Sequence, residues 1–454
     1  MPQNWSSRLS FLLASVGFAV GLGNIWRFPY LAGENGGSAF VLVYLLFAFG
    51  IGMPLVMSEW AIGRRGSGTA SASGSLAEVA AQAGAGRAWG SVGGIAVLAV
   101  FMLMLFYTTV TGWTMDYFAR GAAGGFSRIS AAESQAMFAG LTENPARLAF
   151  WHTVVCVLTV YVNSRGLHAG IERAVKLLMP ALFACMIVMV GYAAAVGDFG
   201  AAARFLLEPD FSRLTGEAVL TALGQAFFSV GIAMAVHMTY GSYLDRRTSI
   251  PRNAFIVVGA DSLVALLAGF AIFPIVFAHG LPLNSGEGLV FETLPIAFGD
   301  LPGGRLFGSV FFLLLIAAAM TSCISNFAPI VAWTRDRFDV SHTTAALAAG
   351  VAMWALGLGT VFSFNLLAGF HPLSFIGLFA ERTIYESLDF IMSNVLLPAG
   401  AFLTSIFIGW IAGREGIREE LGLADGPAFQ VWRALIRYVV PLAVAAIFVG
   451  GVLG

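Results

Sequence analysis

The stretch GFAVGLGNIWRFPY, residues 17–30, lies in the middle of the first long apolar segment and decides how that segment folds. Gly17, Gly21 and Gly23 remove side chains at nearly one-turn spacing, so the backbone can leave helical geometry and offer carbonyls to a ligand. In a membrane, such irregular backbone survives only where protein or a water-filled cavity satisfies it. Close helix packing through Gly17 and Gly21 is the alternative. It does not account for Asn24 and Arg27 in the same span, so the stretch predicts a broken helix that lines a site.

Composition places the chain in a membrane. Its 454 residues are 58% hydrophobic and only 11% charged, whereas soluble domains carry about 25% charged residues. We expect an all-α polytopic membrane protein, because a span needs roughly 20 apolar residues. The first segment has no small-residue cleavage site after it and is interpreted as a retained helix. The eleven expected spans are residues 9–32, 38–62, 90–120, 148–164, 172–195, 217–242, 253–279, 305–334, 342–362, 383–412 and 431–453.

Basic residues predict the orientation. Loops on the side of the N-terminus carry more than twice as many Lys and Arg residues as the opposite loops, which places the N-terminus in the cytoplasm and, with an odd number of spans, the C-terminus outside. The net charge of −1 gives no sign of a nucleic-acid partner. Cys156, Cys185 and Cys323 fall inside expected spans, where they are packing residues rather than a disulfide framework.

Catalytic motifs are missing from the sequence. It contains no HExxH and no GxSxG, and Lys176 is its only lysine, so it has no P-loop. We therefore expect no enzyme. A channel or a substrate sensor remains an alternative to a transporter.

The sixth span resembles the first in being interrupted. It reads GQAFFSVGIAMAVHMTYGSY, residues 224–243, and Ser229 and Gly231 break its apolar run. Each broken span opens a run of five, which predicts two inverted five-helix repeats with helices 1 and 6 broken at the midplane. The repeats cover about 9–195 and 217–412, and an extra helix covers about 431–453, within a single domain of residues 1–454. A short re-entrant or lid helix is expected within 280–304.

Four motifs give the chain a family resemblance. The first-span string, EWAIGR (59–64), GQAFFS (224–229) and TSC (321–323) resemble the neurotransmitter:sodium symporter family in its bacterial amino-acid branch. The resemblance covers essentially the whole chain, in a subgroup that lacks a twelfth helix. It implies a multi-pass symporter of the bacterial cytoplasmic (inner) membrane that takes a small amino-acid substrate, as a monomer or weak homodimer.

The resemblance also implies two sodium sites. Sodium is a hard cation that takes oxygen ligands, which unwound carbonyls and hydroxyls supply. For Thr321 and Ser322 the alternative is hydroxyl bonding within the helix. The first site would use the Ala19 carbonyl, Asn24, Ser229, Asp261 and the substrate carboxylate, and the second the carbonyls of Gly17, Val20 and Ala318 with the hydroxyls of Thr321 and Ser322.

An α-amino acid is the implied substrate. Members that carry monoamines have an aspartate at the position of Gly21, so with glycine the ligand must bring its own carboxylate. Tyr107 would donate its hydroxyl to that carboxylate, although an amphipathic ring packed in a helix bundle is the alternative. Ile232 would add to an apolar, adaptable side-chain pocket. The implied substrate residues are Ala19, Gly21, Leu22, Gly23, Leu103, Tyr107, Phe228, Ser229, Gly231, Met234, Ser322 and Asn326.

Charges within the spans match the family's gates. Arg27 and Asp389 match the outer pair, which closes directly or through water, and Trp5, Tyr243 and Asp336 match parts of the inner gate.

The inner gate departs from the family pattern at one position. Pro2 stands where the family usually has a basic residue, and whether Asp336 pairs instead with Arg8 is open. Glu59, next to Trp60, has either a transport role or a structural pairing with loop arginines.

Asp261 predicts how the site balances charge without chloride. Many family members bind chloride near the positions of Tyr44, Gln225 and Ser229, and one bacterial member instead has a carboxylate where this chain has Ala265. Asp261 supplies a carboxylate one turn earlier and could replace the anion. The alternative is that Asp261 is only a sodium ligand and chloride is still bound.

The expected activity is sodium-coupled import of hydrophobic, aliphatic and aromatic, L-amino acids, independent of chloride. Proton coupling through Asp261 is the alternative.

Overall fold

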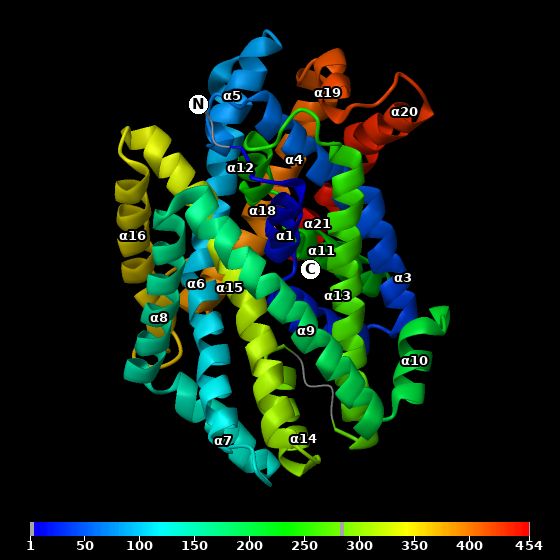
Figure 1. Cartoon of the computed structure of the whole chain (residues 1–454), viewed down its shortest axis with the longest axis vertical. Coiled ribbons are helices and arrows are strands. Elements are labelled where there is room, and N and C mark those ends of the chain that lie inside the picture. The colour runs from blue at the N-terminus through cyan, green and yellow to red at the C-terminus, as the bar shows by residue number, and fades with distance from the viewer. Residues whose placement is uncertain (1–3, 282–285, 454) are drawn as a thin grey trace.

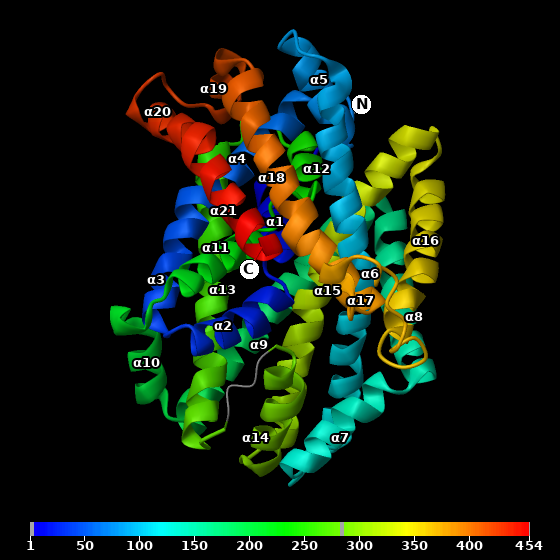
Figure 2. The same ribbon diagram turned by 180° about the vertical axis from the view of Figure 1, so that it is seen from behind.

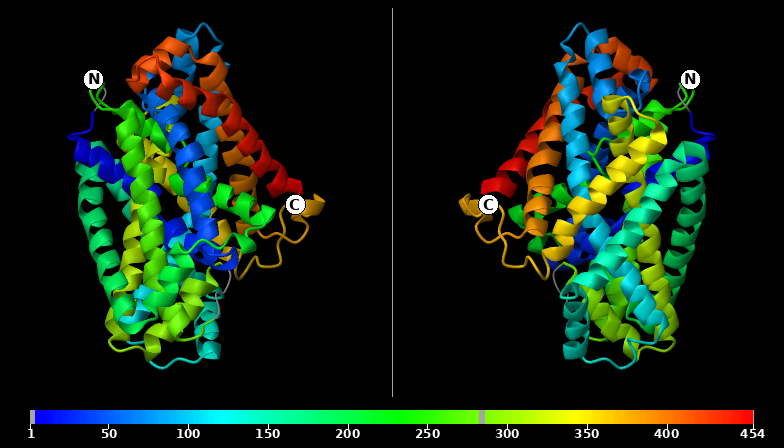
Figure 3. Two further views of the ribbon diagram at one scale, coloured as in Figure 1. Left: turned by 90° about the vertical axis from the view of Figure 1, so that its right-hand side faces the viewer. Right: turned by 90° about the vertical axis from the view of Figure 1, so that its left-hand side faces the viewer.

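The computed structural model describes residues 4–281 and 286–453, and this part of the chain is built from helices without a strand. Most long helices run along the long axis of the molecule, with α1 (Arg8–Ala19) near its middle (Figure 1). The N-terminus and α5 (Ala72–Gln82) lie at one end, and α7 (Ala131–Thr142) and α14 (Leu294–Asp300) lie at the other (Figures 1 and 3). The expected all-α class is confirmed.

The first span is broken as its glycines predict. Ser7 caps α1 by accepting the N–H of Ser10, and the helix ends at Val20, whose backbone is extended. The chain resumes as η1 (Gly23–Arg27) and α2 (Phe28–Glu34), and the two halves are bent by 53°.

The sixth span has a longer break. It consists of α11 (Gly216–Val230) and α12 (Val236–Ser242), with residues 231–235 between them. Gly231, Ala233 and Ala235 all have positive φ angles, of 68°, 61° and 60°. Glycine adopts this left-handed conformation freely, whereas each alanine costs roughly 1–2 kcal/mol. Ser229, which was expected to belong to the interruption, lies in the last turn of α11, because the left-handed Gly231 ends that helix.

The other nine expected spans are continuous helical segments within the described residues. In Figure 2, α21 lies along α18. The segments are α3 (Ser38–Phe47), η2 (Ala48–Gly52) and α4 (Met53–Arg65); η3 (Arg87–Trp89) and α6 (Gly90–Ala122); α8 (Pro145–Ser164); η4 (Leu167–Glu172) and α9 (Arg173–Val196); α13 (Ile250–Ala278); α15 (Gly304–Phe338); α16 (His342–Phe362); α17 (Ile384–Phe390), η8 (Ile391–Leu396), α18 (Leu397–Ile406) and η9 (Phe407–Ile411); and α20 (Pro427–Ala434), η10 (Leu435–Val439) and α21 (Val440–Leu453).

Short helices fill the connections. The expected helix within 280–304 is η6 (Leu289–Thr293) continued by α14. The others are α10 (Phe199–Leu207), η5 (Phe211–Arg213), η7 (Gly377–Phe379) and α19 (Arg414–Leu421).

Apolar side chains are exposed on the outside of the bundle and ionisable ones are buried inside it, as expected for a protein in lipid. Leu177 and Ile187 on α9 expose 72% and 69% of their surface, whereas the side chains of Glu59, Asp116 and Asp261 are fully buried. Buried ionisable groups within a membrane bundle mark functional positions or need specific partners.

The second half of the sixth span is held against α4 by close backbone contacts. A Cβ on Gly63 of α4 would overlap the carbonyl oxygen of Met238 on α12, and one on Gly241 would lie 2.7 Å from the carbonyl oxygen of Trp60. Small residues allow helices to approach this closely in a membrane. The glycine of the EWAIGR motif therefore fixes α12 against α4.

We predict that Gly63→Ala lowers the free energy of unfolding by about 1–3 kcal/mol, because the methyl group overpacks this contact. The measurement is the melting temperature of the purified protein in detergent. Gly94→Ala on α6 is the matched control, since nothing lies within 4 Å of its added methyl group. Equal melting temperatures for the two variants would contradict the prediction.

Candidate substrate and sodium sites

The two helix breaks meet at a small cavity of about 30 Å³. Eleven of the twelve expected substrate residues line it, and Phe18 and Asn24 complete the wall. Leu22, the twelfth, does not line the cavity but donates its backbone N–H to the Tyr107 hydroxyl at 3.3 Å. Ile232 does not line it either, because the break turns its side chain toward Gly52 of η2. The lining residues are Phe18, Ala19, Gly21, Gly23, Asn24, Leu103, Tyr107, Phe228, Ser229, Gly231, Met234, Ser322 and Asn326.

The cavity exists because some of its wall positions are glycines, which have no side chain to fill it. A Cβ on Gly21 would stand 2.9 Å from Ser322 Oγ and 3.1 Å from the Tyr107 hydroxyl, and one on Gly231 would overlap the Phe18 ring. An aspartate at position 21 would therefore displace both hydroxyls.

A network of buried oxygens stands beside the cavity at Asp261 on α13. Asn24 Nδ2 donates to Asp261 Oδ1 at 2.7 Å and to Ser229 Oγ at 3.0 Å. Ser229 Oγ and the Tyr44 hydroxyl donate to Asp261 Oδ2 at 2.7 and 3.2 Å. Within the described residues Asp261 forms no ion pair. A buried carboxylate without a counter-ion is costly. The oxygen atoms around Asp261 therefore suit a monovalent cation as ligands.

Gln225, expected near a chloride position, lies next to this network. Its Nε2 donates to the Gly23 carbonyl at 3.1 Å, and its buried Oε1 has no partner within the described part of the chain. Ala265 is fully buried on the same helix as Asp261.

A second group of oxygens lies where α1 ends. Ser322 Oγ is within 3.5 Å of the Gly17 carbonyl, 3.3 Å of the Phe18 carbonyl and 3.4 Å of the Val20 carbonyl. Thr321 Oγ1 donates to the carbonyls of Ala317 and Ala318, each at 2.9 Å. The expected second set is thus brought together, and the intrahelical bond foreseen for Thr321 is also present. The Phe18 carbonyl was not foreseen, since backbone orientation in a break has no sequence signal.

The outer gate residues do not form a direct ion pair. Arg27 places its guanidinium 4.8 Å from the centre of the Phe228 ring, and Asp389 accepts from Ser393 Oγ at 3.2 Å. An arginine over an aromatic face is itself stabilised. Tyr385 donates to Glu287 at 3.2 Å and links α17 to the segment that precedes η6, a contact that sequence reasoning missed.

Two of the residues expected at the inner gate belong to an aromatic cluster. Trp5 donates its Nε1–H to the Tyr240 carbonyl and its backbone N–H to the Tyr243 carbonyl, both at 3.1 Å. Its ring meets both tyrosine rings edge-on, at 5.1 and 6.2 Å between centroids.

Asp336 has partners other than the one considered from sequence. It pairs with Arg335 at 3.1 Å and accepts from Thr69 Oγ1. Arg8 donates instead to Asn253 at 2.9 Å, so Arg8 and Asp336 do not pair. Pro2 lies outside the described residues.

Glu59 supports the break in the sixth span. Its Oε1 accepts the N–H of Ala233 at 2.8 Å, which satisfies a backbone donor inside the break. Glu59 forms no ion pair within the described residues, so the pairing with loop arginines is wrong, and Arg64 pairs with Glu420 at 2.7 Å instead. Only the fold brings Glu59 and Ala233 together.

Two broken helices around a small cavity, with a buried carboxylate and a group of backbone carbonyls beside it, define a secondary transporter of the broken-helix class. The chain belongs to the Sodium:neurotransmitter symporter family, whose profile matches residues 2–126 and 137–453. The expected resemblance is confirmed, and the protein is a sodium-dependent multi-pass membrane transporter rather than an enzyme.

Relatives and a solved structure agree with this assignment. The uncharacterised sodium-dependent transporter YhdH of Bacillus subtilis (strain 168) is 37% identical over 450 residues, covering 98% of this chain and 97% of YhdH. The sodium-dependent dopamine transporter of Bos taurus is 25% identical over 506 residues, covering 97% and 67% of the two chains. The crystal structure of MhsT in complex with L-phenylalanine matches with a TM-score of 0.88 at 37% identity, covering 99% of both chains.

We predict that Tyr107→Phe lowers the free energy of unfolding by about 1–3 kcal/mol, because it leaves the Leu22 N–H without its acceptor inside the break. Tyr117→Phe is the matched control on the same helix, since the buried Tyr117 hydroxyl has no partner among the described residues. Thermal unfolding of both variants in detergent tests this. A Tyr117 variant as unstable as the Tyr107 variant would contradict it.

Proposed function

We propose that the chain is a sodium-coupled symporter that imports hydrophobic L-α-amino acids by alternating access. The observation that carries this proposal is the position of the Asp261 network beside Gly21. A bound sodium ion there would be completed by the carboxylate of the substrate, which Gly21 does not supply itself. The likeness to MhsT, whose structure holds L-phenylalanine, supports the same substrate class.

The side-chain pocket is proposed to be apolar and adaptable. Leu103, Phe228 and Met234 supply its walls, and Met234 can adjust its shape to aliphatic or aromatic ligands. The Tyr107 hydroxyl oxygen accepts the Leu22 N–H, and its own O–H is proposed to donate to the substrate carboxylate. The proposed substrate residues are the twelve named from the sequence.

Two sodium ions are proposed to drive transport. The first binds at Asn24, Ser229, Asp261 and the Ala19 carbonyl. The second binds between the carbonyls of Gly17, Val20 and Ala318 and the hydroxyls of Thr321 and Ser322. Because sodium and substrate share the first site, each raises the affinity for the other by the same factor.

Gating is proposed to follow the two helix breaks. Arg27 and Asp389 close the outer side through water, and Trp5, Tyr243 and Asp336 close the inner side. Two inverted repeats, about 9–195 and 217–412, move against each other, and the helix at about 431–453 lies outside them. The excess of basic residues supports a cytoplasmic N-terminus in the bacterial inner membrane. A monomer or weak homodimer is proposed.

We predict that L-leucine uptake into proteoliposomes requires an inward sodium gradient and stops when choline replaces sodium. Ser322→Ala should weaken sodium activation at least about tenfold, because a desolvated cation loses a ligand. Ser405→Ala is the control, since the Ser405 hydroxyl bonds within α18 away from the cavity. Uptake that persists in choline would refute the proposal, and unchanged sodium activation in Ser322→Ala would remove the second site.

We predict that uptake is unaffected when gluconate replaces chloride, because Asp261 supplies the anion near the first sodium. Asp261→Asn should make transport chloride-sensitive or abolish it. Adding Ala265→Glu to that variant restores a carboxylate one turn along α13 and should restore chloride independence. A large fall in uptake by the unmutated protein in gluconate would defeat this prediction.

A further inference from the structure

A second and much larger cavity lies beyond the inner gate. Its volume is about 630 Å³, against about 30 Å³ for the central cavity. It is bounded by Tyr243 at the end of α12, by α15, and by loops that the distribution of basic residues assigns to the cytoplasm. We call it the cytoplasmic cavity. Small-molecule sites typically occupy 300–1,000 Å³, so it has room for an amino acid.

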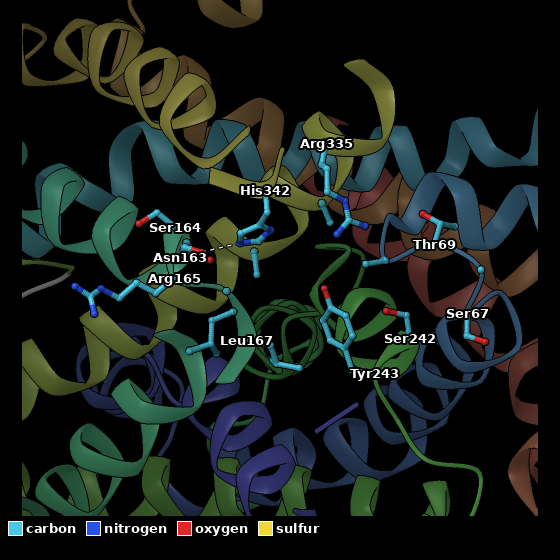
Figure 4. A pocket seen from close by; sticks show the side chains of 16 residues that line it. Ser67, Thr69, Asn163, Ser164, Arg165, Leu167, Ser242, Tyr243, Arg335 and His342 are labelled. Atoms are coloured by element: carbon cyan, nitrogen blue, oxygen red, sulfur yellow. Dashed lines mark hydrogen bonds between the residues drawn. The ribbon is translucent and has the colours of Figure 1, made fainter. Parts of the chain in front are cut away.

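Among acidic and basic side chains, only basic ones line the cytoplasmic cavity in the described part of the chain. Its described lining includes Arg165, Arg335 and His342 and no aspartate or glutamate. Figure 4 shows Arg335, His342 and Tyr243 directed toward one shared space, whereas Arg165 extends away from it. The Arg165 guanidinium lies 4.5 Å from the centre of the Tyr161 ring. Arg335 already pairs with Asp336 at 3.1 Å, so what it offers a ligand is its remaining N–H groups rather than an unbalanced charge.

Two hydrogen-bond donors near Arg335 have no partner among the described residues. Arg335 directs Nε and Nη2 to a single oxygen of Asp336, at 3.3 and 3.1 Å. Its Nη1 and the hydroxyl of Tyr243 have no hydrogen-bond partner within residues 4–281 and 286–453. A guanidinium edge and a phenol hydroxyl are good donors to a carboxylate.

His342 offers an acceptor on the opposite side. Its Nε2 lies 2.8 Å from the carbonyl oxygen of Asn163, which can only accept, so Nε2 carries the hydrogen. In the neutral imidazole Nδ1 is then a lone-pair acceptor, and among the described residues it has no donor. Such an acceptor suits an ammonium group.

We propose that the cytoplasmic cavity is a second, weaker binding site for the transported amino acid on its way into the cell. The Arg335 guanidinium and the Tyr243 hydroxyl bind the carboxylate, His342 Nδ1 accepts from the ammonium group, and Leu167 and Ile171 contact the apolar side chain. This inference rests on the proposed function. It differs from the central site in one respect that can be tested: neither sodium cluster borders this cavity, so binding here does not need sodium.

The experiment is binding of L-leucine to the purified protein by saturation-transfer NMR in choline buffer without sodium. The central site is expected to be empty under these conditions, so the signal reports the cytoplasmic cavity. Arg335→Gln and His342→Gln should each weaken this binding at least fivefold. Arg337→Gln should leave it within twofold, because Arg337 is an exposed arginine on the same helix that does not line the cavity.

Three results would overturn the proposal. They are no sodium-free leucine signal from the unmutated protein, a signal that survives both substitutions, and equally tight binding of 4-methylpentanoate, which lacks the ammonium group. Sodium-dependent leucine binding, measured on every variant, shows that each is folded. Its absence from the unmutated protein would refute the proposed function instead, so the two failures are distinguishable.

Discussion

The structure depends on satisfying the backbone of two helix breaks where no bulk water can do so. Inside a bilayer each unpaired N–H or C=O group costs several kcal/mol. Here side chains take the place of water, three of them from other helices and one from the first span itself. Tyr107 accepts from Leu22, Glu59 accepts from Ala233, Asn24 accepts from Gly21, and Gln225 donates to the Gly23 carbonyl. The carbonyls of Gly17, Phe18 and Val20 face the Ser322 hydroxyl, where the proposed second sodium ion would bind.

The buried side chains around the first break also determine the electrostatics of the central site. Asp261 is buried against Asn24, Ser229 and Tyr44, and none of them carries a positive charge. The network is therefore polar, and within the described residues no positive side chain neutralises it. Gly21 leaves open space next to this network. In the proposed function the ligand brings a second carboxylate to that space, and ion and substrate affinity are then properties of one shared site.

The residues expected at the two gates make different kinds of contact at the two ends of the central cavity. On the outer side Arg27 lies on Phe228, and Tyr385 reaches Glu287 on the segment before η6. On the inner side Trp5 binds the two carbonyls at the end of α12. Close contacts at Gly63 and Gly241 tie α12 to α4, so movement of the inner gate must carry α4 or break that contact. The larger cavity, of about 630 Å³, lies beyond Tyr243 on the same side as the aromatic cluster of Trp5.

The sequence by itself determined the membrane class, the spans, the break in the first helix and nearly all the residues of the central cavity. It could do so because composition, apolar run length and glycine spacing are local properties, and because motif resemblance carries ligand positions along the chain. Only the tertiary structure decided the partners. Glu59 meets Ala233, Asp336 meets Thr69 rather than Arg8, and Arg27 lies on Phe228 without reaching Asp389. Ile232 does not line the cavity, and the break in the sixth span begins at Gly231. The left-handed backbone within residues 231–235 sets side-chain directions that no sequence periodicity predicts. These contacts join residues far apart in the chain, and their geometry exists only once the helices have packed.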